Sequence, residues 1–149
     1  MDYTWQEKRE PTIISKLEGI KIILDFTEYD IGLFSLASLM FCEYANYTVE
    51  AASICIYLAI YMYCDEKPHF REVVEHTDNA LCTEMALDII QFYNWKLPMF
   101  TFVDMLLYVF GDVSDMEPQI INAVINRNTS ETAIFYALII LYKRRNMKG

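Results

Sequence analysis

The stretch that decides the fold is VEAASICIYLAIYMYCDE, residues 49–66. It contains no charged residue from position 51 to position 64, and its apolar side chains cover every side of a helix instead of one stripe. A helix without a polar stripe is normally enclosed by other helices. The small side chains of Ala51, Ala52 and Ala59 allow such neighbours to approach closely. We therefore expect this stretch to be the buried central helix of the protein.

A membrane span is the competing explanation for so apolar a stretch, because the mean hydropathy of the chain is +0.16. The uncharged run, residues 51–64, would extend only about 21 Å as a helix. A bilayer crossing needs about 20 apolar residues, which is more than this run contains. The other two apolar runs, at residues 31–42 and 132–142, are shorter still. The sequence therefore predicts buried helices of a soluble bundle and no membrane partner.

Further helical segments lie on both sides of the central stretch, separated by prolines, glycines and short polar turns. Apolar residues recur in them every three or four positions, which is the spacing of one helix face. No segment shows the sustained alternation of apolar and polar residues that is typical of a strand. The expected helices cover about residues 12–26, 31–44, 49–66, 68–76, 83–95, 100–111, 115–125 and 131–142.

Start and stop signals accompany these segments. Thr12 and Thr48 are predicted to cap the first helix and the central helix, because a threonine hydroxyl can accept a hydrogen bond from the first turn. Gly111 is predicted to end the helix before it. In the helix at 31–44 the apolar residues are expected on one side, namely Leu33, Leu36, Leu39 and Met40.

These elements predict an all-α fold in a single domain, residues 1–149. A length of 149 residues is typical of one domain. The content of only 4 Gly and 4 Pro argues against a turn-dense β fold. We expect a core at about residues 12–97 and additional helices at about 98–145.

Acidic residues outnumber basic ones by 21 to 12, so the net charge is -9. Nucleic-acid binding needs clustered Lys and Arg, and nucleic acid is therefore not an expected partner. The last seven residues do hold a basic group: Lys143, Arg144, Arg145 and Lys148. This group either complements the dipole at the end of a final helix or serves nuclear import or an anionic surface.

Cofactor and metal chemistry find little support in the sequence. The four cysteines form no CxxC pair, and His69 and His76 lack the tight spacing of a structural zinc site. The first twelve residues, MDYTWQEKREPT, do not form a secretory signal. We therefore expect reduced thiols, no cofactor, no metal, and a location inside the cell, in the nucleus, the cytoplasm or both.

Catalysis is not predicted either, so the protein is not expected to be an enzyme. No GxSxG motif and no glycine-rich phosphate loop occurs. Glu84 and Asp88 share one helix face, but an acid–base pair would need burial to shift its pKa values. Tyr61 and Tyr63 lie late in the central helix, where they either pack in the core or form part of a protein-binding surface.

The order of segments resembles a cyclin box over residues 33–110. The stretch that carries the resemblance is HTDNALCTEMALDIIQFYNWKLPMFTFVDMLLYVF, residues 76–110. It combines a threonine-aspartate turn, a helix, a tryptophan-led exit and a proline followed by phenylalanine. The resemblance implies a five-helix bundle around the third helix, with extra C-terminal helices. It also implies a regulatory subunit that binds a cyclin-dependent-type protein kinase and controls its activity.

The chain departs from the family pattern where cyclins usually contact the kinase. Tyr61 stands where the family has a lysine, and Ala86 stands where it has a glutamate. The first-helix region TIISKLEGIKIIL lacks the expected arginine, so the substrate-docking patch of some cyclins is not predicted. The predicted partner-binding residues are Tyr61, Asp65, Glu66, Glu84 and Asp88.

Two other functions fit the same sequence features. One is an all-helical adaptor or viral inhibitor that binds host signalling or apoptosis proteins through a groove between helices. The other is a cyclin-box transcription factor, although the acidic balance disfavours direct contact with DNA.

Overall fold

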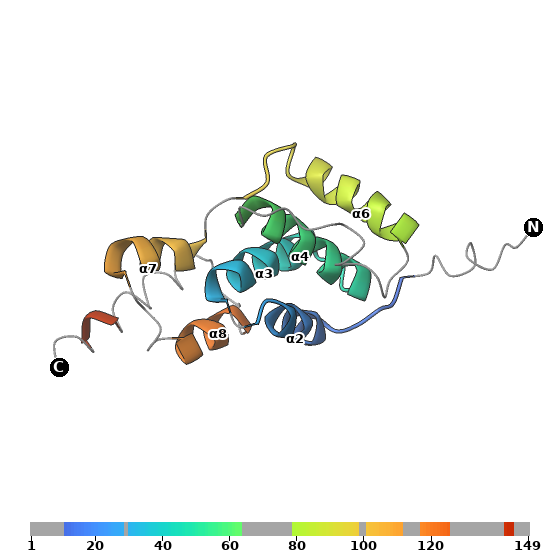
Figure 1. Ribbon diagram of the computed structural model, residues 1–149. Helices are drawn as coiled ribbons and strands as arrows, with labels where there is room; N and C mark the ends of the chain where they lie inside the picture. Colours follow the sequence, from blue (N-terminus) through green and yellow to red (C-terminus); the bar gives the residue numbers. More distant parts are fainter. Residues whose placement is uncertain are drawn as a thin grey trace, which may run out of the picture. The chain divides into compact units, whose positions relative to one another are not determined.

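The computed structural model describes residues 11–28, 30–63, 79–98, 101–111, 117–125 and 142–144. In this part of the chain every regular element is a helix, apart from one isolated antiparallel bridge between Ile13 and Thr48 (Figure 1). The predicted all-α class is therefore confirmed. The principal helices are α2 (Lys16–Phe26), α3 (Ile31–Tyr44), α4 (Val49–Tyr63), α6 (Asn79–Phe92), α7 (Phe102–Phe110) and α8 (Glu117–Ile125).

The chain divides into two compact units, Met1–Met99 and Phe100–Gly149. The first unit contains α2, α3, α4 and α6, and the second contains α7 and α8. The expected helices at 68–76 and 131–142 lie outside the described residues, except for Tyr142. The arrangement of a cyclin box stays a prediction.

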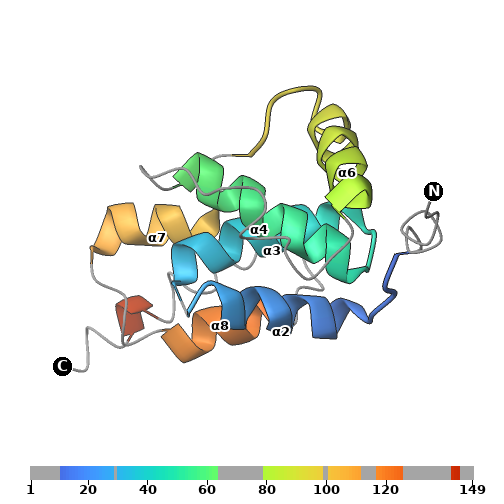
Figure 2. The same cartoon turned by 45° about the vertical axis from the view of Figure 1, so that its right-hand side comes forward.

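Helix α4 is the central element of the first unit, as its sequence predicts. It packs against α2, α3 and α6, and α2 and α6 lie on opposite sides of it in both Figure 1 and Figure 2. Ala51, Ala52 and Ala59 have no exposed surface. Small side chains at these positions let the neighbouring helices come close, so α4 is enclosed along most of its length.

Helix α3 is more deeply buried than predicted. Every residue from Gly32 to Phe41 is buried, including Ser35 and Ser38. The expectation of one apolar side therefore understates its burial. The reason is visible in the sequence of the helix, which carries no charge before Glu43 and so offers no face that needs water.

The first helix starts later than predicted, because a better cap follows Thr12. The Ser15 hydroxyl accepts a hydrogen bond from the Glu18 N–H at 3.0 Å, and the Glu18 carboxylate accepts one from the Ser15 N–H at 3.4 Å. This reciprocal capping box defines the start of α2 at Lys16. The prediction of Thr12 as the cap is wrong.

Thr12 instead joins the chain to the beginning of α4. Its N–H donates to the Glu50 carboxylate at 2.6 Å, and its carbonyl accepts from the Val49 N–H at 3.0 Å. The predicted cap of α4 is confirmed, since the Thr48 hydroxyl accepts from the Ala51 N–H at 3.0 Å. The segment before α2 is thereby held against the start of the central helix.

Helix α6 begins at Asn79, earlier than the predicted start at Thr83. Its side toward α4 carries Cys82, Met85 and Ile89, all of which are buried. These residues recur every three or four positions, so they form the single apolar stripe of an amphipathic helix. The opposite side of α6 is left at the surface.

In the second unit, α7 and α8 each bury one stripe. Val103 and Leu106 are buried on α7, and Ile120 and Val124 are buried on α8. Gly111 ends α7 with a φ of +76°, as predicted, because glycine adopts this backbone conformation without steric cost. Over the described ranges, we find no helix with both the length and the apolar character needed to cross a bilayer.

Candidate functional site

Three of the five predicted partner-binding residues lie in the part of the chain that the structure describes. Tyr61 is in the last turn of α4 with 46% of its surface exposed, and Glu84 and Asp88 are exposed on α6. Asp65 and Glu66 lie outside the described residues. Helices α4 and α6 pack on each other, so the three residues belong to two neighbouring elements of the first unit.

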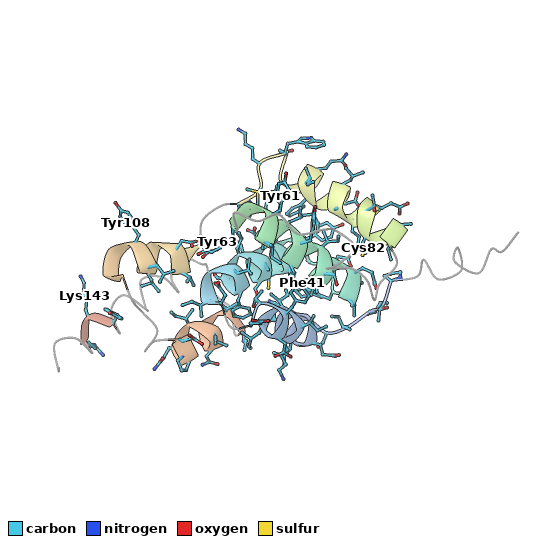
Figure 3. All side chains as sticks on the ribbon, viewed as in Figure 1. Phe41, Tyr61, Tyr63, Cys82, Tyr108 and Lys143 are labelled. Carbon is cyan, nitrogen blue, oxygen red and sulfur yellow. The ribbon has the colours of Figure 1, made fainter. Side chains whose placement is uncertain are left out.

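The end of α4 presents two tyrosines (Figure 3). The ring of Tyr61 lies 6.2 Å from the ring of Tyr57, one helical turn earlier. The Tyr63 hydroxyl lies against Gly32 of α3, at a place that any larger residue would fill. Tyr63 is 38% exposed. Tyr63 therefore covers the start of α3, whereas Tyr61 offers more of its surface to a partner.

A pair of tyrosine–carboxylate hydrogen bonds connects the end of α3 to α6. The Tyr44 hydroxyl donates to Asp88 at 3.4 Å, and the Tyr93 hydroxyl donates to Glu43 at 2.5 Å. The end of α3 contributes Tyr44 as a donor and Glu43 as an acceptor, and its partners are Asp88 on α6 and Tyr93 just after α6. The ring of Phe92 also meets the ring of Tyr44 edge-on, with 5.9 Å between centroids. These contacts position Asp88 on the surface that α3 and α6 share.

The surroundings of this pair raise the pKa of both hydroxyls. Burial is the main cause for Tyr44, and the neighbouring Asp88 carboxylate adds to it. Burial is also the main cause for Tyr93, followed by its hydrogen bond to Glu43. Both tyrosines therefore keep their protons and act as hydrogen-bond donors throughout the physiological range.

The exposed side of α6 has an acidic character. Glu84 and Asp88 are exposed one turn apart on α6, and Glu43 is exposed at the end of α3. No lysine or arginine occurs from residue 79 to residue 95. The nearest cationic side chain along this part of the chain is that of Lys96. Residues 79–95 therefore carry a net negative charge.

Several residues of this region were missed by the sequence analysis. Glu43, Tyr44 and Tyr93 do not stand out, because the residues in each hydrogen-bonded pair are 44 or 50 positions apart. Phe92 lies within the helix predicted at about residues 83–95, and half of its surface is exposed. The sequence does contain a pattern that indicates this exposure, because Phe92 continues the row of Glu84 and Asp88 at a spacing of four residues.

The carboxylates that α6 presents lie at the surface. Glu84 and Asp88 are exposed to water, which is the ordinary state of carboxylates on a helix surface. The thiol of Cys55 on α4 is fully buried, and burial raises its pKa because it disfavours the charged form. Within the described segments, no three histidines, cysteines or acids come together as a metal site would require.

Comparison with known proteins leaves the family undecided. No family model matches the chain, and no curated protein or solved structure is significantly similar to it.

Proposed function

We propose that this protein is a cyclin-like regulatory subunit that binds a cyclin-dependent-type protein kinase, in the nucleus or the cytoplasm, and controls its activity. The observation that supports the proposal best is the enclosed α4, which ends at an exposed tyrosine and packs beside the acidic face of α6. An enclosed third helix is also what the cyclin-box resemblance implies.

The contact surface in this proposal consists of Tyr61, Glu84 and Asp88, together with Asp65 and Glu66. Cyclins usually present a lysine where this chain has Tyr61 and a glutamate where it has Ala86. The half-exposed ring of Tyr61 takes the place of the lysine as an apolar contact with a polar tip. Glu84 and Asp88 lie on either side of Ala86 and supply the negative charge.

Binding of this kind controls a kinase by selecting one of its conformations. A subunit that contacts the active arrangement more favourably than the inactive one shifts the population toward activity. In protein kinases the active arrangement requires a Lys–Glu ion pair and an ordered activation loop. The acidic surface around Glu84 and Asp88 fits a kinase element that carries basic residues, and it accelerates encounter through electrostatic attraction.

The proposal is tested by capturing partners of the full chain from a native lysate and identifying them by mass spectrometry. A protein kinase should be among the stable partners. If other stable partners appear and no kinase does, the proposal is wrong. Capture of signalling or apoptosis proteins in its place would favour the adaptor alternative.

Changing Glu84 and Asp88 together to lysine should weaken kinase capture by about tenfold or more, because like charges across an interface cost several kcal/mol. The matched control changes Asp25 and Glu28 to lysine. These residues are exposed at the end of α2, and the net charge changes by the same amount. Circular dichroism of both variants checks that the fold is kept. Equal capture by the two variants would place the interface elsewhere.

A further inference from the structure

The end of helix α6 contains two left-handed residues in succession. Asn94 closes the helix, since its N–H donates to the Gln91 carbonyl at 2.9 Å and the Trp95 N–H donates to the Ile90 carbonyl at 2.9 Å. The φ of Asn94 is +52°, a conformation that commonly ends a helix and that asparagine tolerates. Trp95 follows with a φ of +65°, which is rare for a bulky residue. The backbone therefore holds this tryptophan in a strained conformation.

Packing inside the chain does not explain a tryptophan at this position. The side chain of Trp95 is 69% exposed, and a glycine would adopt the same backbone conformation without steric cost. Strained residues cluster where proteins bind other molecules. Tryptophan is also among the residues that contribute most to binding when a partner covers them. The surface around Trp95 is therefore a candidate interface.

Two further apolar side chains and two opposite charges lie on the exposed side of α6 and just beyond its end. Leu87 is 49% exposed and Phe92 is 50% exposed. Asp88 is exposed within the helix, and Lys96 is exposed directly after Trp95. We call these five residues the α6 contact face: Leu87, Asp88, Phe92, Trp95 and Lys96. The face combines an apolar area with one acid and one base.

The mixed charge of the α6 contact face indicates which partner fits it. A partner helix of one charge sign would be attracted by one of the two charged residues and repelled by the other. A second copy of the chain carries both signs. Asp88 and Lys96 lie four positions on either side of Phe92. Two antiparallel copies of α6 that cross at Phe92 therefore bring Asp88 of each copy toward Lys96 of the other, in the self-complementary contact that a two-fold axis generates.

The local contacts of Asp88 and Lys96 are compatible with such pairing. Asp88 accepts a hydrogen bond of 3.4 Å from the Tyr44 hydroxyl, and a carboxylate can accept several hydrogen bonds at once. The backbone N–H of Lys96 donates to the Tyr93 carbonyl at 3.0 Å, which ties the residue to the end of α6. Lys96 itself is exposed. Both charges are therefore held near the helix and at the surface.

The size of the apolar area sets the strength of the contact. From their exposed fractions, Leu87, Phe92 and Trp95 present apolar surface on the order of 400 Å². A stable dimer buries about 800 Å² on each partner. A contact of about half that size forms a weak dimer, which populates at micromolar concentrations of the chain and above.

We propose that the α6 contact face joins two copies of this chain into a symmetric, antiparallel dimer. Phe92 and Trp95 of each copy pack on the other copy, and Asp88 of each pairs with Lys96 of the other. The inference goes beyond the proposed function and does not depend on it. Asp88 belongs to both surfaces, so a chain in the dimer cannot present Asp88 to a kinase at the same time.

Sedimentation equilibrium of the purified full chain tests the dimer, with a reducing agent present because the chain has four cysteines. The average mass should rise from 17.5 kDa toward twice that value as the concentration increases from about 1 μM to about 500 μM. Trp95→Gly should raise the dissociation constant by about tenfold or more, because it removes the largest apolar side chain of the contact. A mass that stays at 17.5 kDa at every concentration would overturn the proposal.

Exchanging the charges tests the antiparallel arrangement. Asp88→Lys alone and Lys96→Asp alone each bring like charges together at both symmetric contacts, so each variant should associate about tenfold more weakly than the natural chain. An equimolar mixture of the two variants should regain dimers, because every charged pair in a mixed dimer again joins a lysine to an aspartate. Recovery in the mixture also shows that both variants are folded. A mixture that stays monomeric contradicts the arrangement.

Two matched controls change exposed residues outside the α6 contact face. Asp25→Lys on α2 changes the net charge by the same amount as Asp88→Lys. Tyr108→Ala on α7 removes an aromatic side chain that is 89% exposed. Both controls should keep the dissociation constant of the natural chain. The inference is wrong if Trp95→Gly associates as the natural chain does, or if Asp25→Lys weakens association as much as Asp88→Lys.

The dimer and the kinase proposal fail separately. The mass is measured on the purified chain without a kinase, so a lysate capture that yields no kinase leaves the dimer standing. A chain that stays monomeric leaves the kinase proposal standing, because binding a kinase requires only one copy of the chain.

Discussion

Two glycines show how single residues set the spacing between helices of the first unit. A side chain at Gly19 of α2 would overlap the ring of Phe41, which has no exposed surface. A side chain at Gly32 of α3 would overlap the hydroxyl end of Tyr63, which is partly exposed. The first neighbour is held on all sides by the core, whereas the second can rotate into water.

Replacing each glycine by alanine should separate these two cases. Gly19→Ala should lower the free energy of unfolding by about 1–3 kcal/mol, because overpacking a core costs that much. The better helix propensity of alanine, worth about 0.5–1 kcal/mol, offsets only part of it. Gly32→Ala should cost clearly less, since Tyr63 can move aside. Urea unfolding of both variants measures the difference, and equal losses would mean that Phe41 is not held in place.

At the scale of the element, α4 organises the first unit because it has a neighbour on several sides. It contacts α2, α3 and α6, and its residue Ala59 has no exposed surface. Helix α6, in contrast, has one buried stripe and one exposed side, and its residue Ala86 is only half-buried. The same substitution at these two positions therefore probes an enclosed helix and a peripheral one.

Ala59→Leu should destabilise the protein by about 1–3 kcal/mol, because the enclosed helix leaves no room for a larger side chain. Ala86→Leu is the matched control and should change stability by less than about 0.5 kcal/mol, as substitutions near the surface usually do. Chemical denaturation followed by circular dichroism gives both values. A neutral result for Ala59→Leu would contradict the central position of α4.

At the scale of the whole molecule, the stability of the first unit is linked to pH through groups on three of its segments. Burial raises the pKa of Cys55 on α4, of Tyr44 on α3 and of Tyr93 just after α6. A group with a higher pKa in the folded chain holds its proton more tightly when folded. Its contribution to stability is complete below the pKa of the unfolded chain and is lost as the pH rises above it.

The free energy of unfolding should therefore fall as the pH rises above about 9, the ordinary thiol pKa, and fall further above about 10, that of tyrosine. Fully buried Cys55 contributes a slope on the order of 1 kcal/mol per pH unit. Urea unfolding from pH 7 to pH 11 measures this dependence. Cys55→Ala should show a shallower slope above about pH 9, and Tyr93→Phe should show a shallower slope above about pH 10. Both variants should keep the slope of the natural chain below about pH 8. A stability that stays level to pH 11 would contradict the burial of these groups.

How far the sequence predicts the fold depends on whether the deciding contacts are local. The bounds of α3 and the Thr48 cap of α4 follow from apolar runs and polar breaks, and both predictions are confirmed. The start of α2 was predicted wrongly. Thr12 and Ser15 are both acceptable caps by residue type. Ser15 is the better one because Glu18, three residues later, completes its capping box. Thr12 is instead held by Glu50, 38 positions away, and no local pattern shows that contact.

The candidate site also depends partly on local sequence patterns and partly on contacts between distant residues. The face shared by Glu84 and Asp88 follows from their spacing of four on a helix, which the sequence alone determined. The sequence also determined the helical class and the enclosure of α4, since a helix without a polar side has to be covered by other helices. Only the tertiary structure decided that Tyr44 and Tyr93 join α3 to α6 and that Trp95 stands exposed on a strained turn. Hydrophobic periodicity is a property of neighbours along the chain, whereas these contacts arise from how packed helices bring distant residues together.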